Sequence, residues 1–421
     1  MRTPANTAGA WHEQPGALSR FIGDLIASEV AHLRPGGAAL PAQPWPQELS
    51  LDEDGLGLDS LERLSVASSL NEALHLHESG IEDLLLARRC FGEWLEIAHT
   101  GLRQFDTRLS FRTSGSAGTP KACSHMLATL EQEADCLATM LGGAKRLLVA
   151  VPAHHIYGFL FTVLLPARLG VADVIDVIDV RRATPQTLQR MMSAGDLVIS
   201  HPAHWTLLAK HASAIPAGVA GVTSTAACDD ALARLLEKRG LQRLLQVYGS
   251  SETAGVGWRE QPGAPYCLMP FWSPDSADDS QLLRTIPNGT AHAHQLQDRL
   301  EWLADGRFNL RGRRDEAIQV GGINVFPTRI RQALLEHPGV ADAAVRLMSA
   351  DEGARLKAFI VPVSGTDPRA LCWELERAMQ TRLSAPERPK AWTVGDSLPV
   401  NAHGKHCDWP LVTNTAAHMR A

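Results

Sequence analysis

Residues 112–121 read Arg-Thr-Ser-Gly-Ser-Ala-Gly-Thr-Pro-Lys. The glycines and small hydroxyl residues make a flexible loop whose backbone N–H groups can surround a polyphosphate, and Lys121 adds one positive charge. The loop is not of the GxxxxGK[ST] type, because Lys121 follows a proline and is not followed directly by serine or threonine. By itself the stretch fits a phosphate-binding loop and an ordinary surface turn equally well, so the segments downstream decide between them.

The strongest companion of this loop is Gln246-Val247-Tyr248-Gly249-Ser250-Ser251-Glu252-Thr253, which reads as a strand followed by a polar turn. The two segments together resemble the phosphate loop and the YGxTE motif of the adenylate-forming superfamily, which includes acyl-CoA synthetases, luciferases and peptide-synthetase adenylation domains. The resemblance implies that Tyr248 stacks on adenine, that Ser251 binds phosphate and that Glu252 holds Mg²⁺, which prefers oxygen ligands. It also assigns Lys121 a catalytic charge and gives nucleotide binding to Thr113, Ser114, Gly115, Ser116 and Gly118.

Two segments near the C-terminal end resemble the closing motifs of the same superfamily. In Gly312-Arg313-Arg314-Asp315, Arg313 would bind ribose or phosphate and Asp315 occupies the hinge position of a mobile C-terminal domain. Leu-Pro-Val-Asn-Ala-His-Gly-Lys at 398–405 ends in Lys405, the position of the catalytic lysine. Outside this context, Lys405 would read as a solvated lysine.

Asp298 precedes Arg313 at the spacing that the superfamily uses for its ribose-binding aspartate, although the usual Thr-Gly before it is absent. A carboxylate can accept hydrogen bonds from both vicinal ribose hydroxyls. The alternative is an aspartate on a helix surface.

Two further segments would border the acid pocket. Val-Pro-Ala-His-His-Ile-Tyr-Gly at 151–158 places His155 where the superfamily has a histidine at the end of a strand. Thr225 and Ala226 stand where glycines are usual, and their extra volume would shorten the pocket. A short pocket favours a small aryl acid over a long fatty chain. Without the phosphate loop, His155 would read as a structural loop histidine.

Leu-Gly-Leu-Asp-Ser-Leu-Glu at 56–62 resembles the attachment motif of acyl and peptidyl carrier proteins, which would place a 4'-phosphopantetheine arm on Ser60. A phosphodiester is tolerated at the positive end of a helix. We therefore expect residues 18–105 to form a helical carrier-like domain behind a flexible tail at 1–17. Two alternatives stay open: Asp59 and Ser60 form only a helix N-cap, or residues 18–105 are a reduced N-terminal lobe of the enzyme.

From residue 107 onward, apolar runs alternate with helical segments, which predicts a layered α/β domain with largely parallel strands. We expect an adenylation core at 106–312 and a small mobile α+β domain at 313–421. The expected strands of the core are Arg146–Val151, Ala172–Val180, Leu197–Ser200 and Leu244–Tyr248. Its expected helices are Ala122–Leu141, Pro185–Met192 and Asp229–Lys238. The C-terminal pattern predicts helices at Pro327–His337 and Pro368–Leu383 and strands at Ala341–Met348 and Arg355–Val363.

Composition narrows the class of protein further. The chain has 421 residues, of which 45% are hydrophobic and 20% charged, as in a globular protein of several domains. A net charge of -6 offers no basic surface for nucleic acid. The seven cysteines form no CxxC pair, which favours reduced thiols in a cytoplasm. No apolar run is long enough for a membrane span, and Met1–Ala10 lacks the apolar core of a signal peptide.

The resemblance implies an AMP-forming ligase that works in two steps. A carboxylate attacks the α-phosphorus of ATP, with Mg²⁺ as cofactor, and a phosphopantetheine thiol then takes the acyl group from the adenylate. Lys405, Glu252 and Lys121 would align the groups and neutralise charge without a covalent nucleophile. The carrier-like segment favours an acyl carrier protein, in cis or in trans, as the acceptor. The architecture is similar to that of hydroxybenzoate ligases of aryl-polyene or xanthomonadin-type pigment pathways.

Two other functions stay open. The first alternative is an aryl- or acyl-CoA ligase with a purely structural N-terminal segment. The second is a non-catalytic nucleotide-binding protein that docks carriers. Ala117, where a hydroxyl is usual, and the missing Thr-Gly before Asp298 favour a non-catalytic protein. Intact Lys121, Glu252 and Lys405 favour catalysis.

Overall fold

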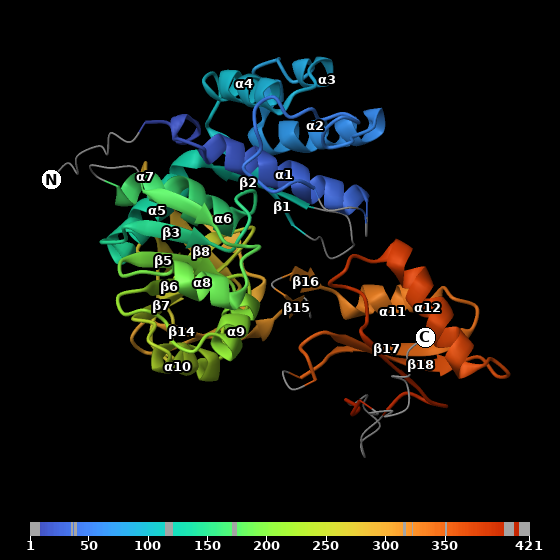
Figure 1. Ribbon diagram of the computed structural model, residues 1–421. Coiled ribbons are helices and arrows are strands. Elements are labelled where there is room, and N and C mark those ends of the chain that lie inside the picture. Colours follow the sequence, from blue (N-terminus) through green and yellow to red (C-terminus); the bar gives the residue numbers. More distant parts are fainter. Residues whose placement is uncertain are drawn as a thin grey trace. The chain divides into compact units, whose positions relative to one another are not determined.

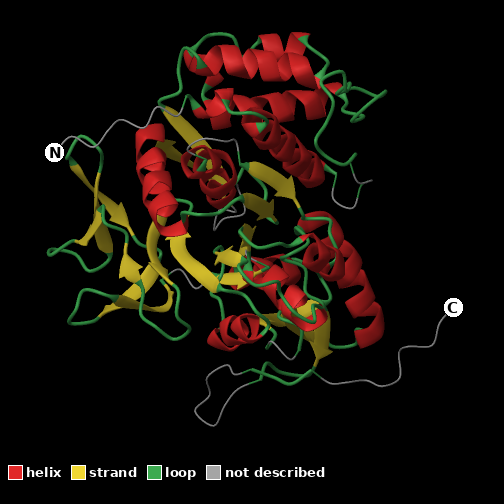
Figure 2. Ribbon diagram, turned by 60° about the vertical axis from the view of Figure 1, so that its left-hand side comes forward, coloured by secondary structure: helices red, strands yellow, loops and turns green. Residues whose placement is uncertain are grey.

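The computed structural model shows two compact units, one ending at Gly312 and one beginning at Arg313 (Figure 1). Strands and helices are mixed in both units (Figure 2). In the described part of the chain, no helix combines the length and the apolar content that a membrane crossing requires. The structure describes residues 9–34, 37, 40–113, 121–170, 175–314, 317–321, 323–349, 352–399 and 408–411.

A seven-stranded sheet forms the centre of the first unit, in the order β4-β3-β5-β6-β7-β8-β9. Neighbouring strands from β4 to β7 run parallel, whereas β8 and β9 are antiparallel additions at one edge. This sheet confirms the expected layered α/β core. Its strands are β3 (Arg146–Val149), β4 (Asp176–Asp179), β5 (Asp196–Ser200), β6 (Ala220–Thr223), β7 (Arg243–Ser250), β8 (Ala254–Arg259) and β9 (Cys267–Leu268).

Helices cover both faces of this sheet, as a parallel sheet requires. Side chains alternate between two apolar clusters: Leu147 and Val149 of β3 belong to one, and Leu148 belongs to the other. The first cluster includes α5 (Leu127–Leu141), α6 (Ile156–Phe159), the π-helical turn η3 (Leu160–Leu164) and α7 (Leu165–Leu169). The second includes α8 (Pro185–Met191), α9 (Pro202–His211) and α10 (Asp230–Lys238).

The expected helix over Ala122–Leu141 is wrong in its first turn. Residues Lys121–Met126 form strand β2, which pairs in antiparallel fashion with β1 (Arg108–Thr113). Cys123 and His125 are buried while their neighbours are exposed, and this period of two is that of a strand. The helix α5 begins only at Leu127.

The described residues of 18–105 share one apolar cluster with the large sheet, so the structure does not confirm a separate carrier-like domain. The ring of Phe21 lies 5.7 Å from that of Phe159 in α6, and Phe159 lies 5.5 Å from Phe111 in β1. Arg112 of β1 also pairs with Glu72. One continuous apolar cluster therefore joins these helices to the sheet. They are α1 (Ala17–Leu33), α2 (Ser60–Leu74), α3 (Leu84–Ala87) and α4 (Phe91–Leu102).

Two small sheets follow the large one in the first unit. The three-stranded sheet contains β10 (Trp272–Pro274), β11 (Gln281–Thr285) and β12 (Ala291–Gln295). The two-stranded sheet contains β13 (Asp298–Trp302) and β14 (Phe308–Arg313).

The second unit is a small α+β domain with its own apolar core. The expected helices and strands are present, and the pattern missed β16 and the final strand β19, which pairs parallel to β18. The elements are β15 (Ile318–Val320), β16 (Ile323–Val325), α11 (Pro327–Leu335), β17 (Val340–Leu347), β18 (Leu356–Pro362), α12 (Pro368–Arg382) and β19 (Ala391–Val394).

Candidate functional site

The polar segments singled out from the sequence follow the parallel strands of the large sheet. His155 comes after β3, Thr225 after β6, and Ser251 and Glu252 after β7. Because the carboxyl ends of parallel strands meet at one edge, these side chains share the edge at which open α/β sheets bind ligands. The candidate site therefore lies along this edge.

The turn between β7 and β8 holds Glu252 in a defined backbone conformation. The backbone N–H of Ser250 donates to Thr253 Oγ1 at 3.1 Å, and that of Glu252 donates to Ser250 Oγ at 3.2 Å. Ala254 then takes a left-handed φ of 58°, which reverses the chain into β8. No described residue forms a hydrogen bond or ion pair with the half-buried Glu252 carboxylate.

One face of β2 lies against this turn. Lys121, Cys123 and His125 alternate with side chains of the other face, as strand geometry requires. Burial, together with the Glu252 charge and against the Lys121 charge, raises the pKa of Cys123 to about 11. The structure thus places Lys121 and Glu252 within electrostatic reach of the same thiol.

His125 attaches the turn to β2 directly. Its Nε2 lies 2.6 Å from the carbonyl oxygen of Ser251, so the ring nitrogen donates to that oxygen. Burial lowers the pKa of His125 to about 4, and the imidazole is neutral at pH 7. The sequence motifs gave no signal for this contact.

Tyr248 and Asp298 are brought together, although fifty residues separate them. The phenolic oxygen of Tyr248 donates to Asp298 Oδ2 at 3.0 Å. Asp298 is the first residue of β13, so the alternative of a helix-surface aspartate is wrong. Rings of Tyr266 and Phe308 lie 6.1 Å and 5.7 Å from the Tyr248 ring, and together they form an aromatic wall behind it.

The loop after β3 is fixed by a buried carboxylate that motif reading missed. Asp24 of α1 is only 4% exposed and accepts a hydrogen bond from the Ala153 N–H at 2.7 Å. Arg181 pairs with the same carboxylate at 2.7 Å. His155, two residues after Ala153, is exposed, and the protein around it lowers its pKa, so it is neutral at pH 7.

His154, the histidine directly before His155, has a different environment. Both ring nitrogens of His154 are buried without a hydrogen-bond partner among the described residues, and the His154 ring lies 4.1 Å from that of His155, tilted by 39°. Nδ1 of His201, which follows the adjacent strand β5, is likewise buried and unpartnered in the described ranges. Polar groups without protein partners at one strand edge are unusual and favour a ligand role.

The segment after β6 holds Thr225 in a backbone conformation that glycine adopts more readily. Thr225 has a φ of 74°, in the left-handed region where a β-branched residue is strained. The neighbouring Ser224 donates to the carbonyl oxygen of Val247 at 2.9 Å and ties this segment to β7. Thr225 and the half-buried Ala226 lie at the same sheet edge as His155, with β5 between their strands.

The remaining assigned residues are distributed as follows. Thr113 is the last residue of β1 and pairs with Lys121, and Arg313 is the last residue of β14. Six residues lie outside the described ranges: Ser114, Gly115, Ser116, Gly118, Asp315 and Lys405.

Ser60 is the exposed first residue of α2. The helix begins with a capping box, in which the Asp59 side chain accepts from the N–H groups of Leu61 and Glu62, and Glu62 accepts from Asp59 N–H. This is the N-cap alternative derived from the sequence. Leu61, the second residue of α2, is 74% exposed.

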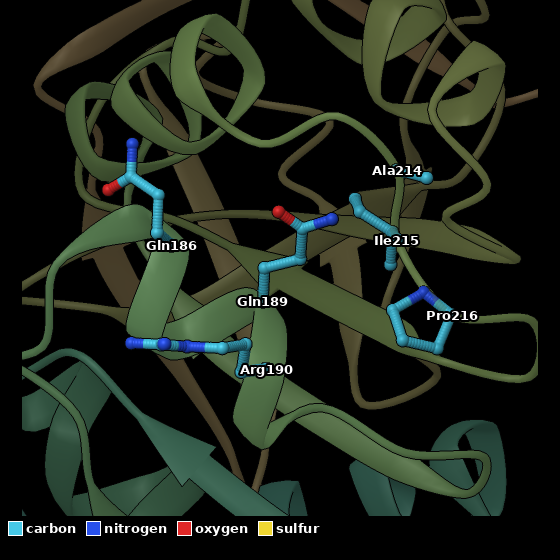
Figure 3. Close-up of a pocket in the computed structure, with 6 residues that line it drawn as sticks. All are labelled: Gln186, Gln189, Arg190, Ala214, Ile215 and Pro216. Atoms are coloured by element: carbon cyan, nitrogen blue, oxygen red, sulfur yellow. The ribbon is translucent and has the colours of Figure 1, made fainter.

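A separate depression lies away from this edge. Figure 3 shows three side chains of α8 opposite a segment that leads into β6. Both segments precede strands, so the depression is at the amino edge of the sheet and has no part in the site. It is lined by Gln186, Gln189, Arg190, Ala214, Ile215 and Pro216.

Comparison with known proteins identifies the family. The description "AMP-binding enzyme" matches residues 93–277, and "AMP-binding enzyme C-terminal domain" matches residues 330–405. A protein of Halorhodospira halophila named 4-coumarate–CoA ligase is 40% identical, with 92% of this chain and 97% of that protein covered. A protein of the same name from Rhodobacter capsulatus is 38% identical, with 93% of this chain and 100% of that protein covered.

Solved structures show the same fold at low sequence identity. The amide bond synthetase of Marinactinospora thermotolerans has a TM-score of 0.59 at 17% identity, with 92% of each chain covered. A double mutant of o-succinylbenzoate CoA synthetase from Bacillus subtilis has a TM-score of 0.56 at 20% identity, with 71% and 67% covered.

The match to the Halorhodospira protein also bears on the N-terminal helices. The match leaves 8% of this chain uncovered, which is fewer residues than half of the segment 18–105. Most of that segment is therefore shared with a protein named as a CoA ligase, in agreement with its packing against the sheet. The chain belongs to the family of AMP-binding enzymes and is an AMP-forming acid–thiol ligase.

Proposed function

We propose that this enzyme adenylates a hydroxylated aryl acid of the hydroxycinnamate or hydroxybenzoate type and transfers the acyl group to coenzyme A. The similarity to proteins named 4-coumarate–CoA ligase, at 37–40% identity over more than nine-tenths of the chain, carries the proposal. The names of these relatives give coenzyme A as the acceptor, and the N-terminal helices of this chain pack as part of the enzyme. We therefore place coenzyme A before a carrier protein, and we propose no phosphopantetheine on Ser60.

The catalytic assignment rests on charge placement. An oxygen of the substrate carboxylate attacks the α-phosphorus of ATP, the bond to the bridging oxygen breaks, and pyrophosphate leaves. Lys121 would bind the phosphates as negative charge moves onto pyrophosphate, and Lys405 would lie between carboxylate and α-phosphate. Glu252 fits a Mg²⁺ ligand, because its half-buried carboxylate has no other described partner; the bound ion would supply further charge neutralisation.

The nucleoside is assigned to the aromatic side of the site. Tyr248 presents an aromatic ring beside Tyr266 and Phe308, on which adenine can stack. Asp298 accepts the Tyr248 hydroxyl, and a carboxylate has enough lone pairs to accept a further hydrogen bond from a ribose hydroxyl. Ser251 and Thr113 are proposed as phosphate ligands, and Arg313 as a ribose or phosphate ligand. The domain boundary at 312/313, with Asp315 as the hinge, belongs to the same proposal.

The polar groups along the strand edge support a hydroxylated aryl acid. His154 and His201 offer ring nitrogens without described partners, and these can exchange hydrogen bonds with a phenolic hydroxyl. Thr225 and Ala226 fill space that glycines would leave open, which suits a planar acid without a long chain. His155, which is exposed directly before α6, is proposed to border the acid pocket.

ATP–pyrophosphate exchange tests this function. 4-Coumarate, 4-hydroxybenzoate, unsubstituted cinnamate and a medium-chain fatty acid should be compared at equal concentration, followed by thioester formation with coenzyme A or a holo-carrier protein. We expect exchange with the hydroxylated aryl acids and thioester formation with coenzyme A. Exchange with the fatty acid alone, or no exchange with any acid, would refute the substrate class. Thioester formation with the carrier alone would refute the acceptor.

A further inference from the structure

The backbone on both sides of Glu252 is held by buried side chains from three distant elements. They are His125 of β2, Glu133 of α5 and Arg284 of β11. None of them belongs to the nucleotide motifs of the sequence. His125 and Arg284 contact the main chain of the turn between β7 and β8, and Glu133 contacts that of Gly255 in β8, directly after the turn.

Glu133 holds the C-terminal side of the turn. It is fully buried, and its two carboxylate oxygens lie 3.0 Å and 3.1 Å from the backbone nitrogen of Gly255, which donates to them. A Cβ atom at position 255 would lie 2.3 Å from Glu133 Oε1, so only glycine allows this approach. Burial raises the pKa of Glu133 to about 7, although Arg284 and the Gly255 N–H act to lower it.

Arg284 balances this buried carboxylate and adds a second attachment. Its guanidinium lies 3.7 Å from Glu133 and donates to the carbonyl oxygen of Thr253 at 3.2 Å. It also donates to the carbonyl oxygen of Thr129 at 2.5 Å and stacks over the ring of Phe271 at 4.4 Å. The guanidinium therefore joins the turn to the first turn of α5.

The N-terminal side of the turn is held by His125, whose Nε2 donates to the carbonyl oxygen of Ser251 at 2.6 Å. The backbone is thus fixed one residue before Glu252 and one residue after it. The main chain of the intervening Glu252 has little freedom to rotate, so its Cα–Cβ bond keeps one direction and restricts where the carboxylate can reach.

We propose that Glu133, Arg284 and His125 are positioning residues of the ligase, which hold Glu252 in the orientation that binds Mg²⁺. Burying an ion pair gives little net stability compared with apolar side chains of similar volume, so stability alone is a weak reason for Glu133 and Arg284. Their bonds to the turn's backbone give a direct reason, because groups behind a metal ligand fix its direction. The inference rests on the proposed function through the assignment of Glu252.

The test compares Glu133→Gln, His125→Leu and His125→Gln with the unaltered enzyme. The amide introduced by Glu133→Gln keeps an acceptor for Gly255 but loses the charge that faces Arg284. The side chain introduced by His125→Leu cannot donate to Ser251, whereas the amide introduced by His125→Gln can. Asp196→Asn is the matched control, because Asp196 is 3% exposed and pairs with Arg146 at 2.7 Å at the start of β5. That pair lies at the opposite edge of the sheet.

Two quantities are measured. The first is the Mg²⁺ concentration for half-maximal pyrophosphate exchange, which we expect to rise about tenfold or more in Glu133→Gln and His125→Leu, to return toward normal in His125→Gln and to stay unchanged in Asp196→Asn. The second is amide hydrogen exchange across 250–256 without nucleotide, which should accelerate in the same two variants. The KM for the acid should stay unchanged throughout.

An unchanged Mg²⁺ requirement in Glu133→Gln and His125→Leu would overturn the inference, as would an equal rise in the Asp196 control. If Glu133→Gln does not fold, the two His125 variants decide by themselves. Glu252→Gln separates the inference from the proposed function. If this variant keeps the normal Mg²⁺ requirement, the metal assignment is wrong, while faster exchange across 250–256 would still establish that the buried residues hold the turn.

Discussion

Asp24 provides the sharpest test of how the N-terminal helices contribute to the site. Its carboxylate accepts the Ala153 N–H at 2.7 Å, Arg181 at 2.7 Å and the Gln43 amide at 3.2 Å. Asp24→Asn keeps the size of the side chain but removes the charge and turns an amide N–H group toward Arg181 or Ala153. The loop that leads to His155 then loses its fixed attachment to α1.

The size of the effect follows from burial. Removing one partner of a buried ion pair costs about 3–5 kcal/mol of folding free energy. Arg181 is 29% exposed and keeps Asp179, so the loss should lie near the lower end, at about 3 kcal/mol. Asp179→Asn is the matched control. Asp179 is the other partner of Arg181 and is 40% exposed, so its loss should cost less than about 1 kcal/mol of folding free energy.

The assay combines thermal or urea unfolding with the KM values of the acid and of ATP in pyrophosphate exchange. We expect Asp24→Asn to lower stability and to raise the acid KM without changing the ATP KM, because Ala153 precedes His155 and not the phosphate-binding turn. Equal effects of Asp24→Asn and Asp179→Asn on the acid KM would refute this reasoning. So would a loss of stability below about 0.5 kcal/mol in Asp24→Asn.

Three further predictions follow from individual contacts. Thr225→Gly should relieve about 1–2 kcal/mol of left-handed strain, partly offset by the freedom of glycine in the unfolded chain, and lower the KM for bulkier acids in pyrophosphate exchange. Lys357 is 1% exposed and donates to the Trp409 carbonyl oxygen at 2.7 Å, so Lys357→Met should cost about 1–3 kcal/mol and accelerate hydrogen exchange at 408–411; unchanged exchange would contradict this. Burial lowers the pKa of His204 from 6.5 to about 4. As the pH falls, the imidazole of the unfolded chain binds its proton before that of the folded chain. The free energy of unfolding is therefore unaffected by His204 above pH 6.5 and falls between about pH 6.5 and about pH 4, by at most about 3 kcal/mol. His204→Gln should reduce this dependence of the unfolding free energy on pH in unfolding measured across that range.

Much of the core could be predicted because its signals are local. The apolar runs that became β3, β5 and β7 lie between turn residues, and parallel strands are buried on both faces, so such runs need no alternation. The first turn of the expected helix at Ala122–Leu141 was wrong because the signal of the strand found there is not local. A strand of a two-stranded hairpin is recognised by its partner, and β1 lies on the other side of the phosphate-loop segment.

The N-terminal segment shows the limit of motif reading. Asp59 and Ser60 begin a helix, as expected, and the capping box at this position satisfies the same local rules in a carrier protein and in an enzyme lobe. An amphipathic helix has an apolar face, but its sequence does not say which surface covers that face. Here Phe21 packs against Phe159 of the sheet-covering helices, which makes the segment part of the enzyme.

By itself the sequence indicated the class of chemistry, because short motifs carry their donors and charges in neighbouring residues. The order of the phosphate loop, the segment Tyr248–Glu252 and the closing lysine motif favours an acid-activating ligase. The tertiary structure alone decided which distant groups meet. Asp298 reaches the Tyr248 hydroxyl, and Glu133 and Arg284 hold the turn beside Glu252. A buried polar contact depends on the path of the whole chain, and residues on either side of it in the sequence leave no pattern that reveals its partner.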